Sequence, residues 1–398
     1  MISSIFGPGL RILRAFGTQA TLPLYELDRA HVQTKGTRIR PFVAGRGFSK
    51  DPLCPGTSAR PPELELTGWR LAHAVKKADC LRQMPFEFLQ RLGFFLEHLP
   101  ALDWRRGNLR LLPGVASAYA DFAGSSLAGR IGQGVALLFM DARGYSFAAH
   151  YPRVAGTPGP DFIFEKHSTT IDRILVEAKG SFVAPTVQPN IKSTLTEGLD
   201  QISKAKSLGA RKSYVVGSFL REHGDPGKEP SLVAFVDPEN DQANLSDGTP
   251  PDLVLRHNYA AWLDAMNLPY AASDLRARSS RDRPEAIRLH TLDLNGTRFG
   301  VVPTHLIFPD DFDEPFELWW WRNGRFVVAG MPMTILREIS RALTDPATPL
   351  TIADEISTAF PTAEHDGEFK GSVLRDGSLL GAVPAQLLYR DPPAEIAL

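Results

Sequence analysis

The sequence predicts a mixed α/β protein in which helices pack on a mixed β-sheet. Between residues 125 and 220, stretches with helical and strand periodicity follow one another in the order helix, three strands, helix, strand (αβββαβ). Residues 286–398 add Asn-Gly and Asp-Gly pairs between apolar alternations, which are strong hairpin signals. Because 398 residues exceed one average core, we expect several domains. We place them at 1–112, 113–285 and 286–398.

The N-terminal region is expected to be mostly loop, with short strands and two helices. Residues 1–66 are rich in Gly, Pro and Arg and show little periodicity. Helical patterns follow at 67–83 and 85–99, and the second carries apolar residues at helical spacing on one face. The fold of residues 1–112 is therefore predicted only as partly helical.

The central region carries the αβββαβ order. The expected elements are a helix at 125–142, strands at 145–154, 161–166 and 171–180, a helix at 194–209, strands at 212–220 and 231–238, and a helix at 253–268. Gly209 is a reasonable stop for the second helix. The Arg-rich segment 274–288 resembles a linker or a basic loop.

The C-terminal region contains an internal repeat and is predicted to form an α+β module with duplicated β-hairpins. Residues 292–308 align without gaps to residues 373–389, and both read as strand, Asn-Gly or Asp-Gly turn, strand, Gly-x-Val-Pro. A third hairpin is expected at 319–332, and helices at 334–343 and 352–360 separate the hairpins.

Composition narrows the class of protein. Hydrophobic residues make up 43% and charged residues 22%, as in soluble globular proteins. No apolar run reaches the roughly 18–20 residues of a membrane span, and the N-terminus lacks a signal-peptide pattern, so we expect no membrane partner and a cytoplasmic location. The two cysteines, Cys54 and Cys80, are too few for a disulfide framework or an all-cysteine zinc site.

Charge is distributed unevenly along the chain. Residues 289–398 carry 8 basic and 16 acidic side chains, whereas residues 1–288 carry 36 and 29. A basic body favours a polyanion such as nucleic acid. The acidic module is a better candidate for a protein partner or for self-association. Solvated surfaces of no special function remain an open alternative for both parts.

Residues 158–182, PGPDFIFEKHSTTIDRILVEAKGSF, predict a hairpin with a definite register. If Asp161 lies opposite Glu177, every other cross-strand pair is either apolar or oppositely charged. These pairs are Phe162–Val176, Ile163–Leu175, Phe164–Ile174, Glu165–Arg173 and Lys166–Asp172. A slip of one residue would exchange the two faces and lose this complementarity. The register therefore follows from packing, and it brings two carboxylates together.

The open end of this hairpin carries charges that packing does not explain. Side chains alternate along a strand, so Glu177 and Lys179 project from one face and converge with Asp161. Two neighbouring carboxylates repel each other unless one is protonated or a cation lies between them. Oxygen ligands of this kind suit Mg²⁺ or Mn²⁺, which can activate a phosphate for hydrolysis. Lys179 could stabilise the charge that develops on that phosphate.

The sequence Pro160-Asp161 followed by Glu177-Ala178-Lys179 resembles the catalytic signature of the PD-(D/E)XK nuclease superfamily. The resemblance covers about a quarter of the chain and implies a restriction-endonuclease-like αβββαβ core. It implies that Asp161 and Glu177 are metal ligands and that Lys179 is the catalytic lysine. The implied activity is Mg²⁺- or Mn²⁺-dependent hydrolysis of nucleic acid, with DNA favoured over RNA, in a context such as bacterial defence, toxins or mobile elements.

Two glutamines complete the candidate catalytic set. Gln201 occupies the place where the family's second helix often carries a polar residue that points at the site. The first helix of the family often supplies another acid, but here the matching residue is Gln133. This departure favours an alternative function, in which a catalytically degenerate nuclease fold serves as an adaptor that binds nucleic acid or protein. Chance occurrence of the short motif is the third explanation.

Weaker signals surround this set. His150 could face the site, although a lone histidine is more often a packed or hydrogen-bonded residue. Four basic residues could line a path for phosphates, or form a solvated surface: Lys192, Lys204, Lys206 and Arg211.

Overall fold

The structure is a computed structural model that describes fifteen stretches of the chain. These are residues 17–27, 62–83, 101–104, 107–118, 122–152, 159–168, 170–184, 187, 189–206, 208–223, 230–236, 250–279, 286–307, 324–352 and 369–398. The helix predicted at 85–99 and residues 353–360 of the helix predicted at 352–360 lie outside the described residues, as does the first strand of the hairpin predicted at 319–332.

The chain forms two compact units, each built from separate stretches of sequence. The central unit comprises Thr18–Thr67 and Leu96–Thr249, and the C-terminal unit comprises Met1–Gly17, Gly68–Phe95 and Pro250–Leu398. These units differ from the three consecutive segments that we predicted. N-terminal strands complete the central sheet, whereas the helix after them packs against helix and hairpin residues near the C-terminus.

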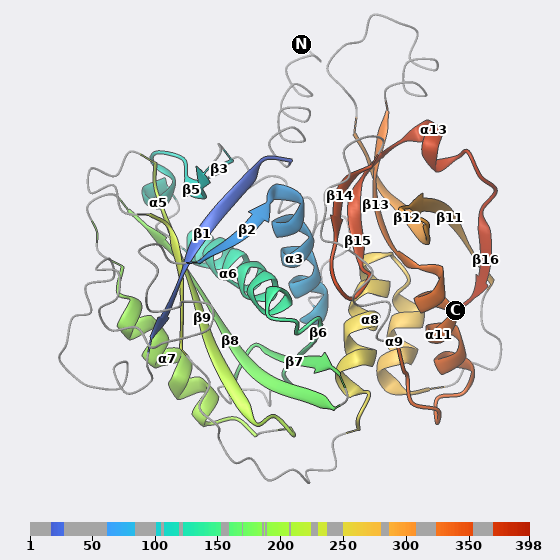
Figure 1. The fold of residues 1–398 in the computed structure, drawn as a ribbon, viewed down its shortest axis with the longest axis horizontal. Helices are drawn as coiled ribbons and strands as arrows, with labels where there is room; N and C mark the ends of the chain where they lie inside the picture. The colour runs from blue at the N-terminus through green and yellow to red at the C-terminus, as the bar shows by residue number, and fades with distance from the viewer. Residues whose placement is uncertain are drawn as a thin grey trace, which may run out of the picture. The chain divides into compact units, whose positions relative to one another are not determined.

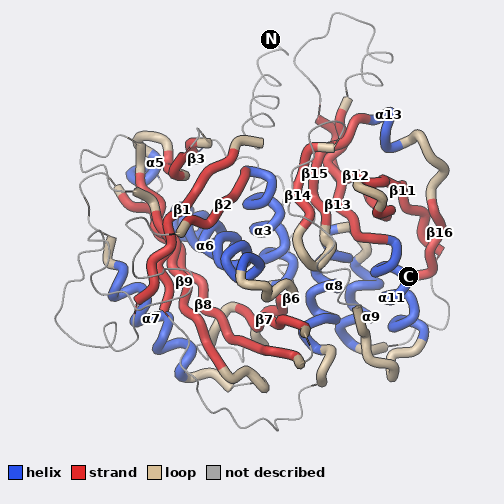
Figure 2. The backbone as a smooth tube through the Cα atoms, viewed as in Figure 1, coloured by secondary structure: helices blue, strands red, loops and turns tan. Residues whose placement is uncertain are grey.

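The central unit is built on a mixed sheet with the strand order β2-β1-β10-β9-β8-β7-β6 (Figure 2). Its strands are β1 (Gln19–Leu27), β2 (Glu63–Thr67), β6 (Phe147–His150), β7 (Phe162–His167), β8 (Ile171–Val183), β9 (Lys212–Arg221) and β10 (Leu232–Val236), and β4 (Gly107–Asn108) pairs with β1. β1 pairs in parallel with β10, and β8 pairs in parallel with β9, whereas β6-β7-β8 and β9-β10 are antiparallel. The mixed α/β class predicted from the sequence is confirmed.

The order of elements between residues 122 and 221 is also as predicted. α6 (Phe122–Ala142) precedes β6, β7 and β8, and α7 (Ile191–Ser203) connects β8 to β9. α7 begins three residues earlier than expected because Asn190 caps it, with the side-chain oxygen of Asn190 accepting from Ser193 N. Three small elements complete the unit: β3 (Leu102–Asp103), β5 (Arg110–Leu111) and α5 (Val115–Ala118).

The register predicted for the β7–β8 hairpin is confirmed pair by pair from Phe162–Val176 to Lys166–Asp172. Arg173 donates to Glu165 Oε1 through Nε at 2.8 Å and through Nη2 at 2.5 Å. Asp172 lies opposite Lys166 and accepts a hydrogen bond of 2.6 Å from the Tyr145 hydroxyl. Cross-strand complementarity was therefore sufficient to fix this register.

α6 and α7 cover opposite faces of the sheet (Figure 1). A β-carbon added at Gly180 would lie 1.8 Å from the carbonyl oxygen of Ala128 in α6, so this helix approaches the β8 backbone directly. A β-carbon at Gly198 of α7 would instead meet Val215 at 2.4 Å. Val215 is the partner of Glu177 in the parallel β8–β9 pair, and residues 177 and 180 lie on opposite faces of β8.

The contacts of α6 and α7 with the sheet form the apolar core of the central unit. α6 buries Ile131, Val135, Leu138 and Phe139, and α7 buries Leu195 and Leu199 against the sheet. Each such side chain contributes roughly 1.5–3 kcal/mol when it is fully buried. Two long, well-packed helices therefore hold the strand ends that carry the candidate site.

The C-terminal unit contains an antiparallel sheet with the strand order β14-β15-β13-β12-β11-β16. Its strands are β11 (Ala286–Leu294), β12 (Thr297–Ile307), β13 (Arg325–Pro332), β14 (Lys370–Val373), β15 (Leu379–Pro384) and β16 (Ala394–Ala397). Its helices are α3 (Gly68–Leu81), α8 (Leu253–Ala265), α9 (Pro269–Ala277), α11 (Met333–Thr344) and α13 (Ala385–Leu388). The α+β organisation predicted for residues 286–398 is observed in their described part.

The repeated hairpins differ in their turns. β11 and β12 are joined by Asn295-Gly296, and both residues have positive φ (49° and 78°), as in a type I′ turn. In the second hairpin Val373 pairs with Leu379, so five residues form the connection, and the expected two-residue turn is wrong there. The reason is that Asp376 turns inward, where it is 1% exposed and accepts from Lys77 Nζ at 2.6 Å and from Asn258 Nδ2 at 2.8 Å.

The prediction of a linker or basic loop at 274–288 is wrong at both ends of the segment. α9 continues to Ala277, and β11 begins at Ala286. Its described arginines are paired with acids. Arg276 binds Asp264, Arg278 binds Asp252, and Arg288 binds Glu395. Their charges are therefore largely offset within the fold.

Candidate active site

Asp161 and Glu177 lie at the open end of the β7–β8 hairpin. Asp161 directly precedes β7, and its backbone N donates to Val176 O at 3.1 Å, one residue out of step with the pairing of β7 and β8. Its Oδ2 accepts from Ala178 N at 3.1 Å. Both carboxylate residues are 3% exposed. Both acids are thus buried at this end of the hairpin, where the regular pairing ends at Phe162–Val176.

Gln133 joins this pair from α6. Its Nε2 donates to Asp161 Oδ1 at 3.3 Å, and its residue is 3% exposed. The close approach of α6 to β8 makes this contact possible, because Gly132 lies against the backbone of Gly180. Among the described residues, no group donates a hydrogen bond to the buried Gln133 Oε1.

Lys179 projects from the same face of β8 as Glu177 and contacts three oxygen atoms. Its Nζ lies 3.2 Å from Glu177 Oε1, and it donates to Gln201 Oε1 at 3.0 Å and to Glu197 Oε1 at 2.8 Å. Gln201 therefore reaches the candidate site through Lys179, as its place on the second helix suggested. All five predicted site residues lie in the central unit, where Gln133 contacts Asp161, and Lys179 contacts both Glu177 and Gln201.

The environment of Lys179 holds it in its charged form. Burial by itself would lower the pKa of Lys179, but the hydrogen bond to Glu197 and the charge of Glu177 outweigh it and raise the pKa above its ordinary value. Lys179 is thus a stable ammonium at neutral pH. It can supply positive charge to a phosphate, but it is poorly suited to remove a proton.

Glu197 is the member of this group that we did not predict. It lies one helical turn before Gln201 on α7, so both side chains reach Lys179 from one face of the helix. The i, i+4 spacing of Glu197 and Gln201 was visible in the sequence. It could have identified Glu197 once Gln201 was placed toward Lys179.

The donor set suits a hard divalent cation. Asp161 and Glu177 offer carboxylate oxygens, and Gln133 Oε1 is a buried oxygen without a hydrogen-bond donor among the described residues. Oxygen ligands of this kind match Mg²⁺ or Mn²⁺. No group of three or more His, Cys, Asp or Glu side chains with metal-binding geometry occurs in the part of the chain that the structure describes. The candidate centre therefore depends on two acids and one amide.

The other predicted residues lie at the edges of this region. His150 ends β6 and pairs with Phe162, one residue from Asp161. Of the four basic residues considered for a phosphate path, Lys204 forms an exposed ion pair with Asp200 at 2.5 Å. The remaining three are Lys192, Lys206 and Arg211, and their role stays a prediction.

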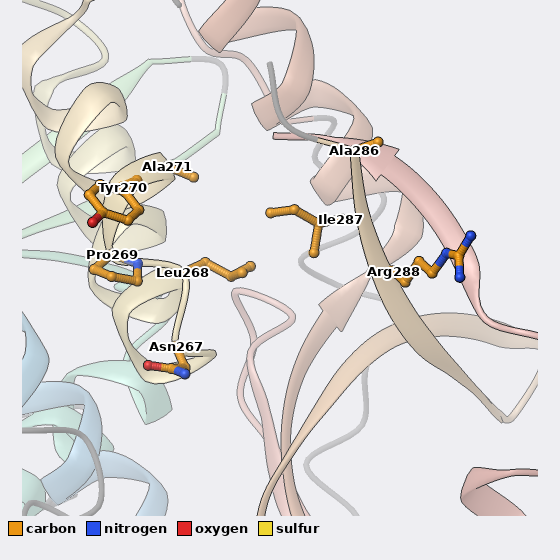
Figure 3. A pocket seen from close by; sticks show the side chains of 8 residues that line it. All are labelled: Asn267, Leu268, Pro269, Tyr270, Ala271, Ala286, Ile287 and Arg288. Atoms are coloured by element: carbon orange, nitrogen blue, oxygen red, sulfur yellow. The ribbon is translucent and has the colours of Figure 1, made fainter. Parts of the chain in front are cut away.

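A separate surface pocket of about 490 Å³ lies in the C-terminal unit, between residues 267–271 and 286–288 (Figure 3). It contains none of the predicted site residues. Within the described residues, no helix combines the length and the apolar character that crossing a membrane requires.

Comparisons with family models, with curated proteins and with solved structures found no match to this chain.

Proposed function

We propose that this protein is a divalent-metal-dependent nuclease of the PD-(D/E)XK type, acting on nucleic acid with DNA favoured over RNA. One observation carries the proposal. The β7–β8 hairpin buries Asp161 and Glu177 at one end, Gln133 of α6 contacts Asp161, and Lys179 of β8, bound by Gln201 of α7, contacts Glu177. Burial of two acids at one end of a hairpin costs desolvation energy even when each has partners, and a role in chemistry accounts for that cost.

Each side chain of the candidate site would have a distinct role in hydrolysis. Asp161 and Glu177 would hold Mg²⁺ or Mn²⁺, with Gln133 Oε1 as a neutral third donor. When bound, such an ion supplies positive charge that polarises a phosphate and makes a neighbouring water more acidic. Lys179 remains protonated and stabilises negative charge that develops on the phosphate. Gln201 orients Lys179 through its 3.0 Å hydrogen bond.

The test is incubation of the purified protein with supercoiled plasmid, linear DNA and RNA, in Mn²⁺ or in EDTA. We expect cleavage that requires the cation and that is lost in Asp161→Ala. Asp200→Asn is the matched control, because it removes an exposed carboxylate that binds Lys204. If the parent cuts none of these substrates with Mn²⁺ or Mg²⁺, or if Asp161→Ala cuts as fast as the parent, the proposal fails.

An adaptor that binds nucleic acid or protein is the second candidate, and Gln133 favours it. A glutamine in place of a third acid leaves the centre with a lower negative charge, which weakens cation binding. Calorimetric titration with Mn²⁺ separates the two functions. If the protein is a nuclease, the parent should bind Mn²⁺ at one site that Glu177→Ala removes. If it is an adaptor, the parent and Glu177→Ala should give the same heats of Mn²⁺ titration.

A further inference from the structure

The ammonium group of Lys179 has no donor left for a substrate. An ammonium carries three N–H donors, and Lys179 Nζ has three oxygen partners within 3.2 Å. These partners are Glu177, Gln201 and Glu197. A phosphate oxygen can therefore bind Lys179 only if one of the three leaves.

Glu197 is the partner that can leave at the lowest cost. Its side chain is 65% exposed, whereas the side chain of Glu177 is 4% exposed and fixed within the sheet. An ion pair with such an exposed partner contributes only about 0.2–1 kcal/mol. A carboxylate and a phosphate also present the same kind of anionic oxygen to an ammonium, so one can replace the other.

We propose that Glu197 occupies the place on Lys179 that a phosphate of the substrate takes, so that binding exchanges one anion for the other. That this phosphate belongs to a nucleic-acid backbone rests on the function proposed above. Glu197 then lowers the affinity of the site for phosphate, because the phosphate must displace an anion before it reaches Lys179. Removal of the Glu197 charge should strengthen phosphate binding.

Asp200 provides a matched control on the same helix. Its side chain is 59% exposed and binds Lys204, so Asp200→Asn removes one negative charge from the outer face of α7 as Glu197→Gln does. An effect of general charge would appear in both variants. An effect of the Lys179 contact would appear only in Glu197→Gln.

The experiment is a titration of the full chain with inorganic phosphate at pH 6 and constant ionic strength, with chloride as the comparison anion. Lysine labelled with ¹³C at Cε reports both binding and the charge of the ammonium, and the signal missing from Lys179→Gln identifies Lys179. We expect phosphate to bind Glu197→Gln about two- to fivefold more tightly than the parent or Asp200→Asn, the range that an exposed ion pair allows. Equal or weaker binding by Glu197→Gln, or no response of the Lys179 signal to phosphate in either protein, overturns the inference.

This readout is independent of cleavage. If Glu197→Gln binds phosphate more tightly but the parent cuts no nucleic acid, the anion exchange stands and the nuclease proposal fails. If the parent cuts DNA but the two phosphate affinities are equal, only the exchange is overturned.

Discussion

The contact between Gly180 of β8 and Ala128 of α6 makes a sharp prediction for Gly180→Ala. The added methyl carbon would lie 1.8 Å from the Ala128 carbonyl oxygen and 2.5 Å from its carbonyl carbon, whereas ordinary contacts begin near 3.4 Å. The two backbones would therefore have to separate by about 1.6 Å. Overpacking of this kind costs about 1–3 kcal/mol, and it would also break the 3.3 Å contact between Gln133 and Asp161.

Hydrogen exchange measured by mass spectrometry on the peptides of α6 is the appropriate assay, because a chain of two units need not unfold in a single step. We expect faster exchange in α6 of Gly180→Ala. Cleavage should fall by about a hundredfold, since a misplacement of about 1 Å can have that effect.

Gly129→Ala is the control for this experiment. A β-carbon at Gly129 meets nothing within 4 Å, and alanine favours a helix by about 1 kcal/mol over glycine. Unchanged exchange in α6 of Gly180→Ala, relative to the parent, would refute the reasoning.

Three further predictions follow from buried charges. Gln133→Glu adds a third acid beside Asp161, so it should lower the melting temperature in EDTA and bind Mn²⁺ at least about tenfold more tightly than the parent; calorimetry showing no gain in affinity would contradict this. Burial lowers the pKa of His73 to about 3, so the unfolded chain takes up a proton near pH 6.5 that the folded chain does not. Stability of the C-terminal unit should therefore be full above pH 6.5 and fall by up to about 1.4 kcal/mol per pH unit below it, with a smaller slope in His73→Phe; equal slopes in urea titrations at pH 7, 6 and 5 would contradict this. Glu165→Ala leaves the buried Arg173 without its carboxylate and should cost the central unit about 3–5 kcal/mol, whereas the exposed Lys166→Ala should cost less than about 1 kcal/mol; similar losses in denaturant titrations would contradict the burial argument.

The central hairpin was predictable because its pairing depends on local complementarity. Glu165 and Arg173 match only in one register, and this register brings Asp161 and Glu177 to the same end of the hairpin. The helix–strand order around it followed from periodicity in the same way. Most of the candidate site could thus be located before any long-range contact was known.

Long-range contacts explain what the sequence did not predict. β1 joins the central sheet by pairing with β10, more than two hundred residues later, and a segment rich in Gly, Pro and Arg gave no signal of that pairing. The turn of the second hairpin depends on Lys77, which lies on α3, about three hundred residues earlier in the chain. Lys77 donates a hydrogen bond to Asp376, which is buried in that turn. Glu197 was missed because its role depends on the position of Lys179 in space rather than on a motif.

The most direct test of the proposed nuclease function is the single-turnover rate of plasmid cleavage in saturating Mn²⁺ by the parent, Lys179→Ala and Asp200→Asn. If Lys179 stabilises charge on the phosphate, its loss should slow cleavage by about a hundredfold or more while Mn²⁺ binding persists, because Asp161 and Glu177 remain. Asp200→Asn should cut at the parental rate. Cleavage by Lys179→Ala as fast as by the parent would contradict the account.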